Sequence, residues 1–373
     1  EKNLENDKLI IWPGLKKYFR GYIIYIVEEF QKPRESKMSI DKLKLEVKNK
    51  SLGKLYLFYG EEEYLKKFYL GKIEEIILSR DQTGLNKIVI EGKAEASKII
   101  EACETMPFFA EKKLVVVKKS ELFNSKKSGS SNNKNDELIT YLQNIPEHTC
   151  LVFYEENIDN RLKITSAVKK YGMVVEFPFQ KPAELVKWAI KVFKSYGKAI
   201  DENTASYLID TCEEGMTEIL NEINKVVLYL GESQKVTVDS IKKVCTKSIK
   251  SRIFDLIDAI AERKLDLALK LLNDMIILKE PMPKILFMIA KQLKQLLELK
   301  LLCSKGMDAK EACSKMGINP YAAKKMVRQT DCFSLEKLKE AIRQALELDL
   351  SIKTGQINDR TAVEILICSL AAE

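Results

Sequence analysis

Short apolar runs alternate with longer stretches of helical periodicity between residues 55 and 177. Each run is apolar at almost every position, which is typical of strands covered on both faces. Five strands are predicted, at residues 55–59, 88–90, 114–117, 150–154 and 173–177. Helices are predicted between them, at residues 62–78, 94–104, 137–143 and 162–171. This alternation predicts an α/β domain with a mostly parallel sheet flanked by helices.

The remainder of the chain has helical periodicity and no strand pattern. Asp201 is placed to cap a helix that ends at Gly215, and an apolar stripe from Ile219 to Leu230 predicts the next helix. After Lys250 the helices become longer, and Ser334 is placed to cap one of them. Their wide apolar stripes predict a bundle whose helices pack against each other or against neighbouring subunits.

These patterns predict three domains preceded by an extension. We expect an α/β domain at residues 38–179, a small helical domain at 180–248 and a helical bundle at 249–373. Met38 looks like a natural beginning, so residues 1–37 are expected to be disordered or a non-native start. Their apolar stretch carries Lys16, Lys17 and Arg20, which interrupt it too much for a membrane span.

The composition argues against a dedicated DNA-binding protein, a disulfide-linked protein and a metal site built on histidine. A hydrophobic fraction of 46% with 31% charged residues is typical of a globular, soluble protein. The net charge of +8 is spread over 373 residues, which permits contact with DNA without arguing for it. The eight cysteines are widely separated, so buried free thiols in a reducing cytoplasm are expected. His148 is the only histidine, and with Cys150 it supplies two metal ligands at most.

An α/β domain followed by a small helical domain is the layout of a P-loop ATPase, so the first strand–turn–helix invites comparison with GxxxxGK[ST]. Gly60 begins the turn and Lys66 occupies the lysine position, but Leu65 replaces the second glycine and Lys67 the hydroxyl residue. Three glutamates at 61–63 would face a triphosphate with negative charge. Acids at a helix N-terminus are also favoured by the helix dipole. Both interpretations predict that no nucleotide cofactor binds here.

The sequence gives little evidence for any other catalytic arrangement. The strand ending in Glu155 and Glu156 resembles the acidic strand end that holds Mg²⁺ in such ATPases, although an ordinary strand end explains it as well. With one histidine in the chain, no Ser/His/Asp or Cys/His arrangement can be assembled. We therefore expect no catalytic residues, no metal site and no cofactor.

A group of apolar residues, Met106, Pro107, Phe108 and Phe109, stands between a predicted helix and a predicted strand. Pro107 cannot continue the helix, and two adjacent phenylalanines cannot face the same side of a strand. We therefore predict a loop, on which large apolar groups need cover. The loop either folds back on its own domain or docks into a partner.

Five segments, taken in order, resemble the delta subunit of the bacterial DNA polymerase III clamp loader from Met38 to the C-terminus. They are LYLFYGEEEY at 55–64, MPFFAEKKLV at 106–115, the stretch 215–226 with EINK at 222–225, FDLIDAI at 254–260 and DLSIK at 349–353. The resemblance implies an AAA+-like P-loop fold that has lost its ATP site, a helical lid and an all-α collar domain. The extension before Met38 has no counterpart in the family.

The resemblance also implies the partners. The family's element for binding the sliding clamp (the beta subunit) falls on Met106, Phe108 and Phe109, with Pro107 between the anchors and phenylalanine at 108 where leucine is common. The subunit would hold the ring open for loading on primed DNA, while ATP acts on neighbouring subunits that contact the collar. It would be a non-catalytic, cytoplasmic part of a DNA-directed DNA polymerase holoenzyme, with no membrane partner.

Three further hypotheses are considered. Tyr321, Lys324, Lys325 and Arg328 form a basic and aromatic cluster, which is either a solvated helix face or a contact to DNA through phosphates and stacking. The chain as a whole could instead be an active AAA+ ATPase of DNA metabolism, which Leu65 and Lys67 disfavour. A nucleic-acid-binding regulator would need a more concentrated basic face.

Overall fold

The computed structural model of the chain describes residues 34–79, 84–93, 95–124, 136–318 and 320–372. Most of the predicted extension, residues 1–33, lies outside the described residues, and helix α3 (Arg34–Asn49) begins within its last part. The chain divides into two compact units. The first consists of the described residues up to Glu61 together with 65–178, and the second of 62–64 together with 179–373.

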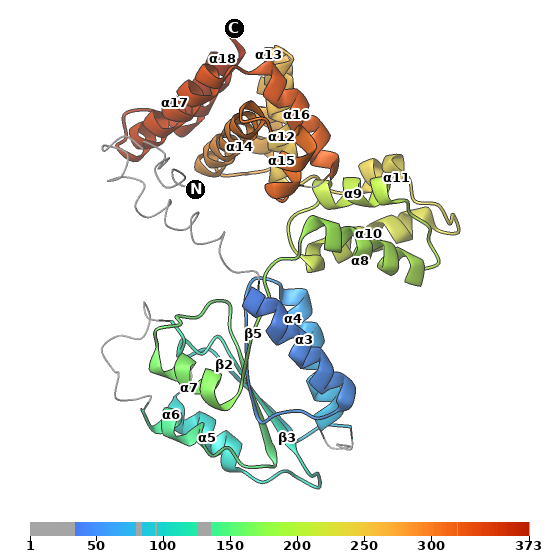
Figure 1. Cartoon of the computed structure of the whole chain (residues 1–373), viewed down its shortest axis with the longest axis vertical. Helices are drawn as coiled ribbons and strands as arrows, with labels where there is room; N and C mark the ends of the chain where they lie inside the picture. Colours follow the sequence, from blue (N-terminus) through green and yellow to red (C-terminus); the bar gives the residue numbers. More distant parts are fainter. Residues whose placement is uncertain (1–33, 80–83, 94, 125–135, 319, 373) are drawn as a thin grey trace, which may run out of the picture. The chain divides into compact units, whose positions relative to one another are not determined.

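The first unit is a parallel α/β sheet, as the alternating pattern predicted (Figure 1). Its elements in chain order are α3, β1 (Leu55–Tyr59), α4 (Glu63–Ile77), β2 (Lys87–Glu91), α5 (Ala96–Glu104), β3 (Lys113–Lys118), α6 (Asp136–Tyr141), β4 (Thr149–Tyr154), α7 (Lys163–Tyr171) and β5 (Met173–Glu176). The strand order is β2-β3-β4-β1-β5, and every neighbouring pair is parallel. Strands β3, β4 and β1 are interior to the sheet, which explains their nearly continuous burial.

Both faces of this sheet are covered. Leu57 and Phe153 are register partners on one face, where they pack with Ile99 of α5 and with α6 and α7. Phe58 lies on the other face with Leu43 of α3 and residues of α4. A sheet buried on both sides leaves its edges and the loops at its strand ends as the exposed parts.

The second unit is helical throughout its described elements. They are α8 (Pro182–Ser195), α9 (Glu202–Thr211), α10 (Met216–Leu230), α11 (Val238–Val244), α12 (Ile249–Ala261), α13 (Leu265–Ile277), α14 (Met282–Ser304), α15 (Ala309–Lys315), α16 (Pro320–Cys332), α17 (Leu335–Lys353) and α18 (Asp359–Ala371). The side chains of Asp201 and Ser334 accept hydrogen bonds from backbone N–H groups of α9 and α17, as predicted. The prediction that the α9 helix ends at Gly215 is wrong, because it ends at Thr211 and Gly215 is the N-cap of α10.

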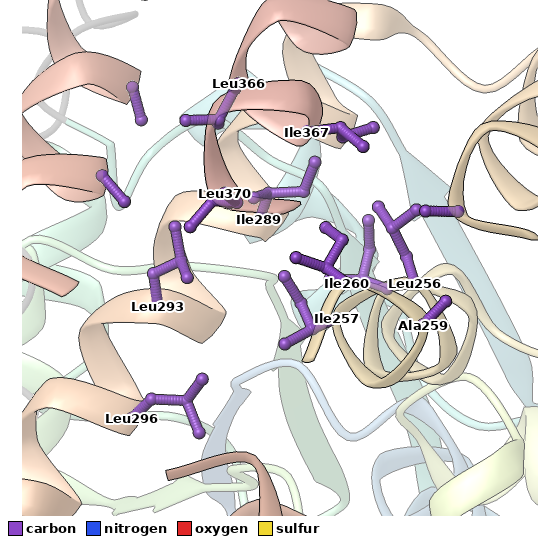
Figure 2. Close-up of a cluster of buried hydrophobic side chains, with 14 of the residues drawn as sticks. Leu256, Ile257, Ala259, Ile260, Ile289, Leu293, Leu296, Leu366, Ile367 and Leu370 are labelled. Atoms are coloured by element: carbon purple, nitrogen blue, oxygen red, sulfur yellow. The ribbon is translucent and has the colours of Figure 1, made fainter. Parts of the chain in front are cut away.

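The apolar stripes of the C-terminal helices converge on one core. Figure 2 shows Leu256, Ile257 and Ile260 of α12 near Ile289 and Leu293 of α14 and residues of α18. This core confirms the predicted all-α C-terminal region, while the division of the second unit near residue 248 stays a prediction. Within the described chain, no helix combines the length and the apolar character that crossing a membrane requires.

Candidate partner-binding loop and the altered phosphate loop

The predicted apolar loop lies between α5 and β3 in the first unit, and its large side chains face solvent. The exposed fractions are 73% for Met106, 51% for Phe108 and 89% for Phe109. The first unit therefore does not cover these side chains. Of the two possibilities for the loop, folding back on its own domain is not observed. An exposed apolar group of this size is typical of a surface that binds another molecule.

The backbone of the loop brings the two rings together. Helix α5 ends at Glu104, ahead of Pro107, which cannot continue a helix. In its last turn the N–H of Thr105 donates to the carbonyl of Glu101 at 3.1 Å. Phe109 has a left-handed φ of 50°, which is unusual for a bulky residue. This conformation lets the rings of Phe108 and Phe109 meet edge to face with centroids 4.5 Å apart. In an extended strand the two rings would point to opposite sides.

The C-terminal end of α5 is held by side chains from the sheet. The Lys113 amino group donates to the carbonyl oxygens of Ala102, at 2.6 Å, and of Thr105, and the Thr149 hydroxyl donates to that of Cys103 at 2.8 Å. Burial lowers the pKa of Lys113, while its position at a helix C-terminus suits a positive charge. These contacts satisfy carbonyls that a helix end leaves open and fix the start of the loop.

Two residues near this loop, Leu85 and Asn86, have no sequence pattern that indicates a site. Asn86, immediately before β2, is 2% exposed and makes two hydrogen bonds to the backbone of Phe108. Leu85 is 62% exposed and precedes it. The only sequence signal was a Gly-Leu-Asn turn before a strand, which is too common to indicate a site.

The turn that resembles a phosphate loop is built for packing. Gly60 has a φ of 116°, and a Cβ placed on it would lie 2.4 Å from the carbonyl oxygen of Phe177. Its N–H donates to the carbonyl of Glu156 at 3.0 Å. Gly60 is therefore required by the close approach of β1 and β5 ends, independently of any phosphate.

Lys66 and Glu155, the two residues closest to an ATPase pattern, are buried. The Lys66 amino group donates to the main-chain carbonyl of Glu155 at 3.1 Å and lies 4.8 Å from the centroid of the Tyr154 ring. The Glu155 carboxylate accepts from the N–H and hydroxyl of Ser120 at 2.9 and 2.6 Å. Burial raises the pKa of Glu155, against the opposing effect of the Ser120 hydrogen bonds and the Lys66 charge. Glu156 is more exposed and lies 3.7 Å from Lys119.

The acids after Gly60 do not form a uniform negative surface. Residues 62–64 belong to the second unit, where the Glu62 carboxylate is 1% exposed and accepts from the backbone N–H of Met216 at 3.2 Å through each oxygen. Met216 is the first residue of α10, so Glu62 supplies a negative charge at a helix N-terminus. Tyr64 packs edge to face on Trp188 of α8, with centroids 5.4 Å apart. Leu65 is partly buried and Lys67 is exposed.

The basic cluster of the C-terminal region lies on α16 against acids of α12. Lys325 is 3.3 Å from Asp255, and Arg328 is 3.5 Å from Asp258 and 3.3 Å from Glu262. Lys324 is exposed, and the side chain of Tyr321 lies outside the described part. These ion pairs oppose much of the positive charge, so contact with DNA stays a prediction. In the described ranges, no three His, Cys, Asp or Glu side chains are grouped as a metal site would need.

Comparisons with known proteins agree with this layout. The family model described as "DNA polymerase III, delta subunit" matches residues 56–178, and that described as "DNA polymerase III delta subunit, C-terminal domain" matches 250–370. The chain is 26% identical to DNA polymerase III subunit delta of Bacillus subtilis over 320 residues, covering 85% of this chain and 92% of the relative. It is 24% identical to a probable delta subunit of Aquifex aeolicus over 307 residues, covering 79% and 85%.

A solved structure supports the same conclusion. The Bacillus subtilis DNA clamp loader delta protein superposes with a TM-score of 0.52 at 25% identity, covering 90% of this chain and all of that one. The two family models together span about two thirds of the chain, one in each compact unit. With its parallel α/β unit and its helical C-terminal region, the chain belongs to the family of DNA polymerase III delta subunits, a component of the clamp loader.

Proposed function

We propose that this subunit binds the sliding clamp through Met106, Phe108 and Phe109 and holds one interface of the ring open. One observation carries the proposal: three large apolar side chains are exposed on a loop whose backbone is fixed by hydrogen bonds. A fixed loop loses little conformational freedom when it docks, so more of its apolar contact contributes to affinity. Aromatic and methionine anchors of this kind favour a partner with an apolar cleft.

Ring opening follows from a difference in affinity. A ligand shifts an equilibrium between closed and open clamp only by binding the two forms unequally. We infer that the loop binds a clamp surface whose shape differs between the two forms and prefers the open one. Moving a ring from 1% to 99% open would require a preference of roughly ten-thousandfold.

ATP would act elsewhere in the assembly. Lys66 is used inside the first unit and Glu62 at the N-terminus of α10, which supports a subunit that does not bind nucleotide. Nucleotide-dependent changes in neighbouring subunits would then expose or hide the loop. The helical bundle is the part we expect to contact those subunits. In this role the subunit would act in the cytoplasm, where the assembly loads the clamp on primed DNA.

The decisive experiment is a binding titration of purified clamp, without nucleotide, against the wild-type chain and the Met106→Ala/Phe108→Ala/Phe109→Ala variant. We expect the variant to bind at least a hundredfold more weakly. The loss of one anchor residue at a docking site typically costs roughly 2 kcal/mol of binding free energy, which lowers affinity more than tenfold. The variant should keep the wild-type unfolding transition, because the three side chains are exposed.

A matched control removes exposed apolar groups elsewhere. Leu228 and Tyr229 of α10 are 81% and 52% exposed, and a Leu228→Ala/Tyr229→Ala variant should bind the clamp as the wild type does. Wild-type affinity or wild-type ring opening by the triple variant would refute the assignment. The rival function, an active ATPase, predicts saturable ATP binding in a calorimetric titration, where we expect none.

A further inference from the structure

The contact between Asn86 and Phe108 joins two separate segments of the first unit. The Phe108 N–H donates to Oδ1 of Asn86 at 2.6 Å, and Nδ2 of Asn86 donates to the Phe108 carbonyl at 2.9 Å. One carboxamide therefore satisfies both polar groups of the Phe108 main chain. Among side chains of this size, only asparagine supplies a donor and an acceptor in this arrangement.

Asn86 is itself fixed to the sheet. Its carbonyl accepts from the N–H of Leu114 in β3 at 2.8 Å, and its side chain is almost fully buried. The main chain of Phe108 is thus tied to the sheet through a single side chain, at the position where the loop carries its exposed rings. A pair of hydrogen bonds from one buried, fixed side chain favours one loop conformation over the alternatives.

The residue before Asn86 adds a second exposed apolar group near the loop. Leu85 is bonded directly to the residue that holds Phe108, and it is 62% exposed. Four large apolar residues from two segments, Leu85, Met106, Phe108 and Phe109, are consequently presented at one end of the β2 and β3 strands. Exposed apolar groups on two neighbouring segments suit a partner surface broader than a single pocket.

We propose that the docking surface for the sliding clamp has two parts, in which Leu85 contacts the clamp and Asn86 is a positioning residue that orders the apolar loop. This inference rests on the proposed function and deepens it, because it names residues outside the element that the family resemblance implied. Continuity with the proposed anchors argues for the same occupant, the clamp, rather than for a second partner. Asn86 acts through Phe108 and touches no partner itself.

The test compares four variants in clamp titrations: Leu85→Ser, Asn86→Ala, Asn86→Asp and the triple alanine variant of the loop. We expect Leu85→Ser to weaken binding about fivefold to tenfold, and both Asn86 variants to weaken it about tenfold, mainly through slower association by a less ordered loop. Asn86→Asp keeps an acceptor for the Phe108 N–H but places a carboxylate against the Phe108 carbonyl. Leu228→Ser, at an exposed leucine of α10, is the matched control and should bind normally.

A second readout separates positioning from simple folding. Amide hydrogen exchange at Phe108 should accelerate at least tenfold in Asn86→Ala, which removes the acceptor of the Phe108 N–H, and stay unchanged in Leu85→Ser, while strand β3 stays protected in all variants. Wild-type binding by Leu85→Ser, or by folded Asn86 variants, would overturn the inference while leaving the loop assignment intact. Unfolding of both Asn86 variants would assign that residue a structural role and overturn its positioning role. Wild-type binding by the triple variant would instead refute the proposed function.

Discussion

The amino group of Lys66 lies 3.1 Å from the main-chain carbonyl oxygen of Glu155, in the interior of the α/β unit. In a nucleotide-binding loop this lysine would reach the phosphates of the ligand. Here it satisfies a carbonyl at the end of β4 and lies over the Tyr154 ring. The same residue type at the same position therefore makes contacts that stabilise the fold.

Replacing Lys66 with alanine should destabilise the first unit. The variant loses a buried hydrogen bond and the packing of a long side chain, so we expect a loss of about 2–3 kcal/mol in the free energy of unfolding. Lys67→Ala, at the exposed neighbour, should change it by less than about 0.5 kcal/mol. Urea denaturation followed by circular dichroism measures both. Equal stability of the two variants would show that the Lys66 contact contributes nothing.

Gly60 and Gly71 offer an opposed pair of glycine-to-alanine substitutions. A Cβ at Gly60 would lie 2.4 Å from the Phe177 carbonyl oxygen, and the backbone there has a φ of 116°. Gly60→Ala should therefore lower the free energy of unfolding by more than about 2 kcal/mol. Gly71 lies inside α4, where a methyl group would meet no atom within 4 Å, so Gly71→Ala should raise it by up to about 1 kcal/mol. Thermal unfolding curves should move in opposite directions.

The buried Glu155 carboxyl should make stability depend on pH. Its pKa is raised by burial, so between the unfolded value near 4.5 and the folded value the native state binds more protons than the unfolded state. Stability from this group therefore falls as pH rises through that window. Glu155→Gln keeps an acceptor for Ser120 and should remove the fall, gaining on the wild type as pH rises. A difference between the two proteins that is constant from pH 4 to pH 8 would contradict this.

Substitution by glycine should change the free energy of unfolding in opposite directions at Phe109 and at Phe108. Phe109 has a φ of 50°, and a non-glycine residue in this region carries strain of about 1 kcal/mol, which Phe109→Gly relieves. Phe108 is not in this conformation, so Phe108→Gly should lower the free energy of unfolding by about 0.5–1 kcal/mol. Both variants should nevertheless lose clamp affinity. Differential scanning calorimetry compares their stabilities, and a lower transition temperature for Phe109→Gly would contradict the strain argument.

Charge reversal at Arg328 tests the basic cluster on α16. Arg328→Glu would face Asp258 and Glu262, so we expect a loss of about 1 kcal/mol in the free energy of unfolding that shrinks at high salt. Lys324→Glu should leave stability unchanged. If the cluster contacts DNA, both substitutions should weaken binding of primed DNA by the assembled loader and reduce its salt dependence. Normal DNA binding by both variants would eliminate that hypothesis.

The alternation of apolar runs and helical stretches was sufficient to predict the parallel sheet, because strands buried on both faces leave an unusually clear pattern. Pro107 and the paired phenylalanines likewise predicted a loop, but they did not decide whether its side chains would be exposed or packed on the same domain. The end of the α9 helix was misplaced, because apolar periodicity continues through Cys212 while the backbone there is extended. Gly215 was recognisable as a terminal residue, but not as the start of the next helix.

Contacts between distant segments could not be predicted. Nothing in the sequence links Asn86 to Phe108 or Glu62 to Met216, because each pair is joined only after the chain has folded. Lys66 shows the related difficulty that a motif position can be occupied by the expected residue in a different role. Side chains that bind the backbone of a residue distant in the sequence carry no local sequence pattern, so they are found only from coordinates, unlike the helix caps of α9 and α17.

The carboxylate that caps α10 is covalently part of the chain. An ion or a nucleotide at a helix N-terminus can diffuse away or be hydrolysed, whereas Glu62 can do neither. In the proposed role, the start of α10 would keep its counter-charge through every round of ATP turnover in neighbouring subunits. This subunit would then be the component that stays the same from one loading cycle to the next.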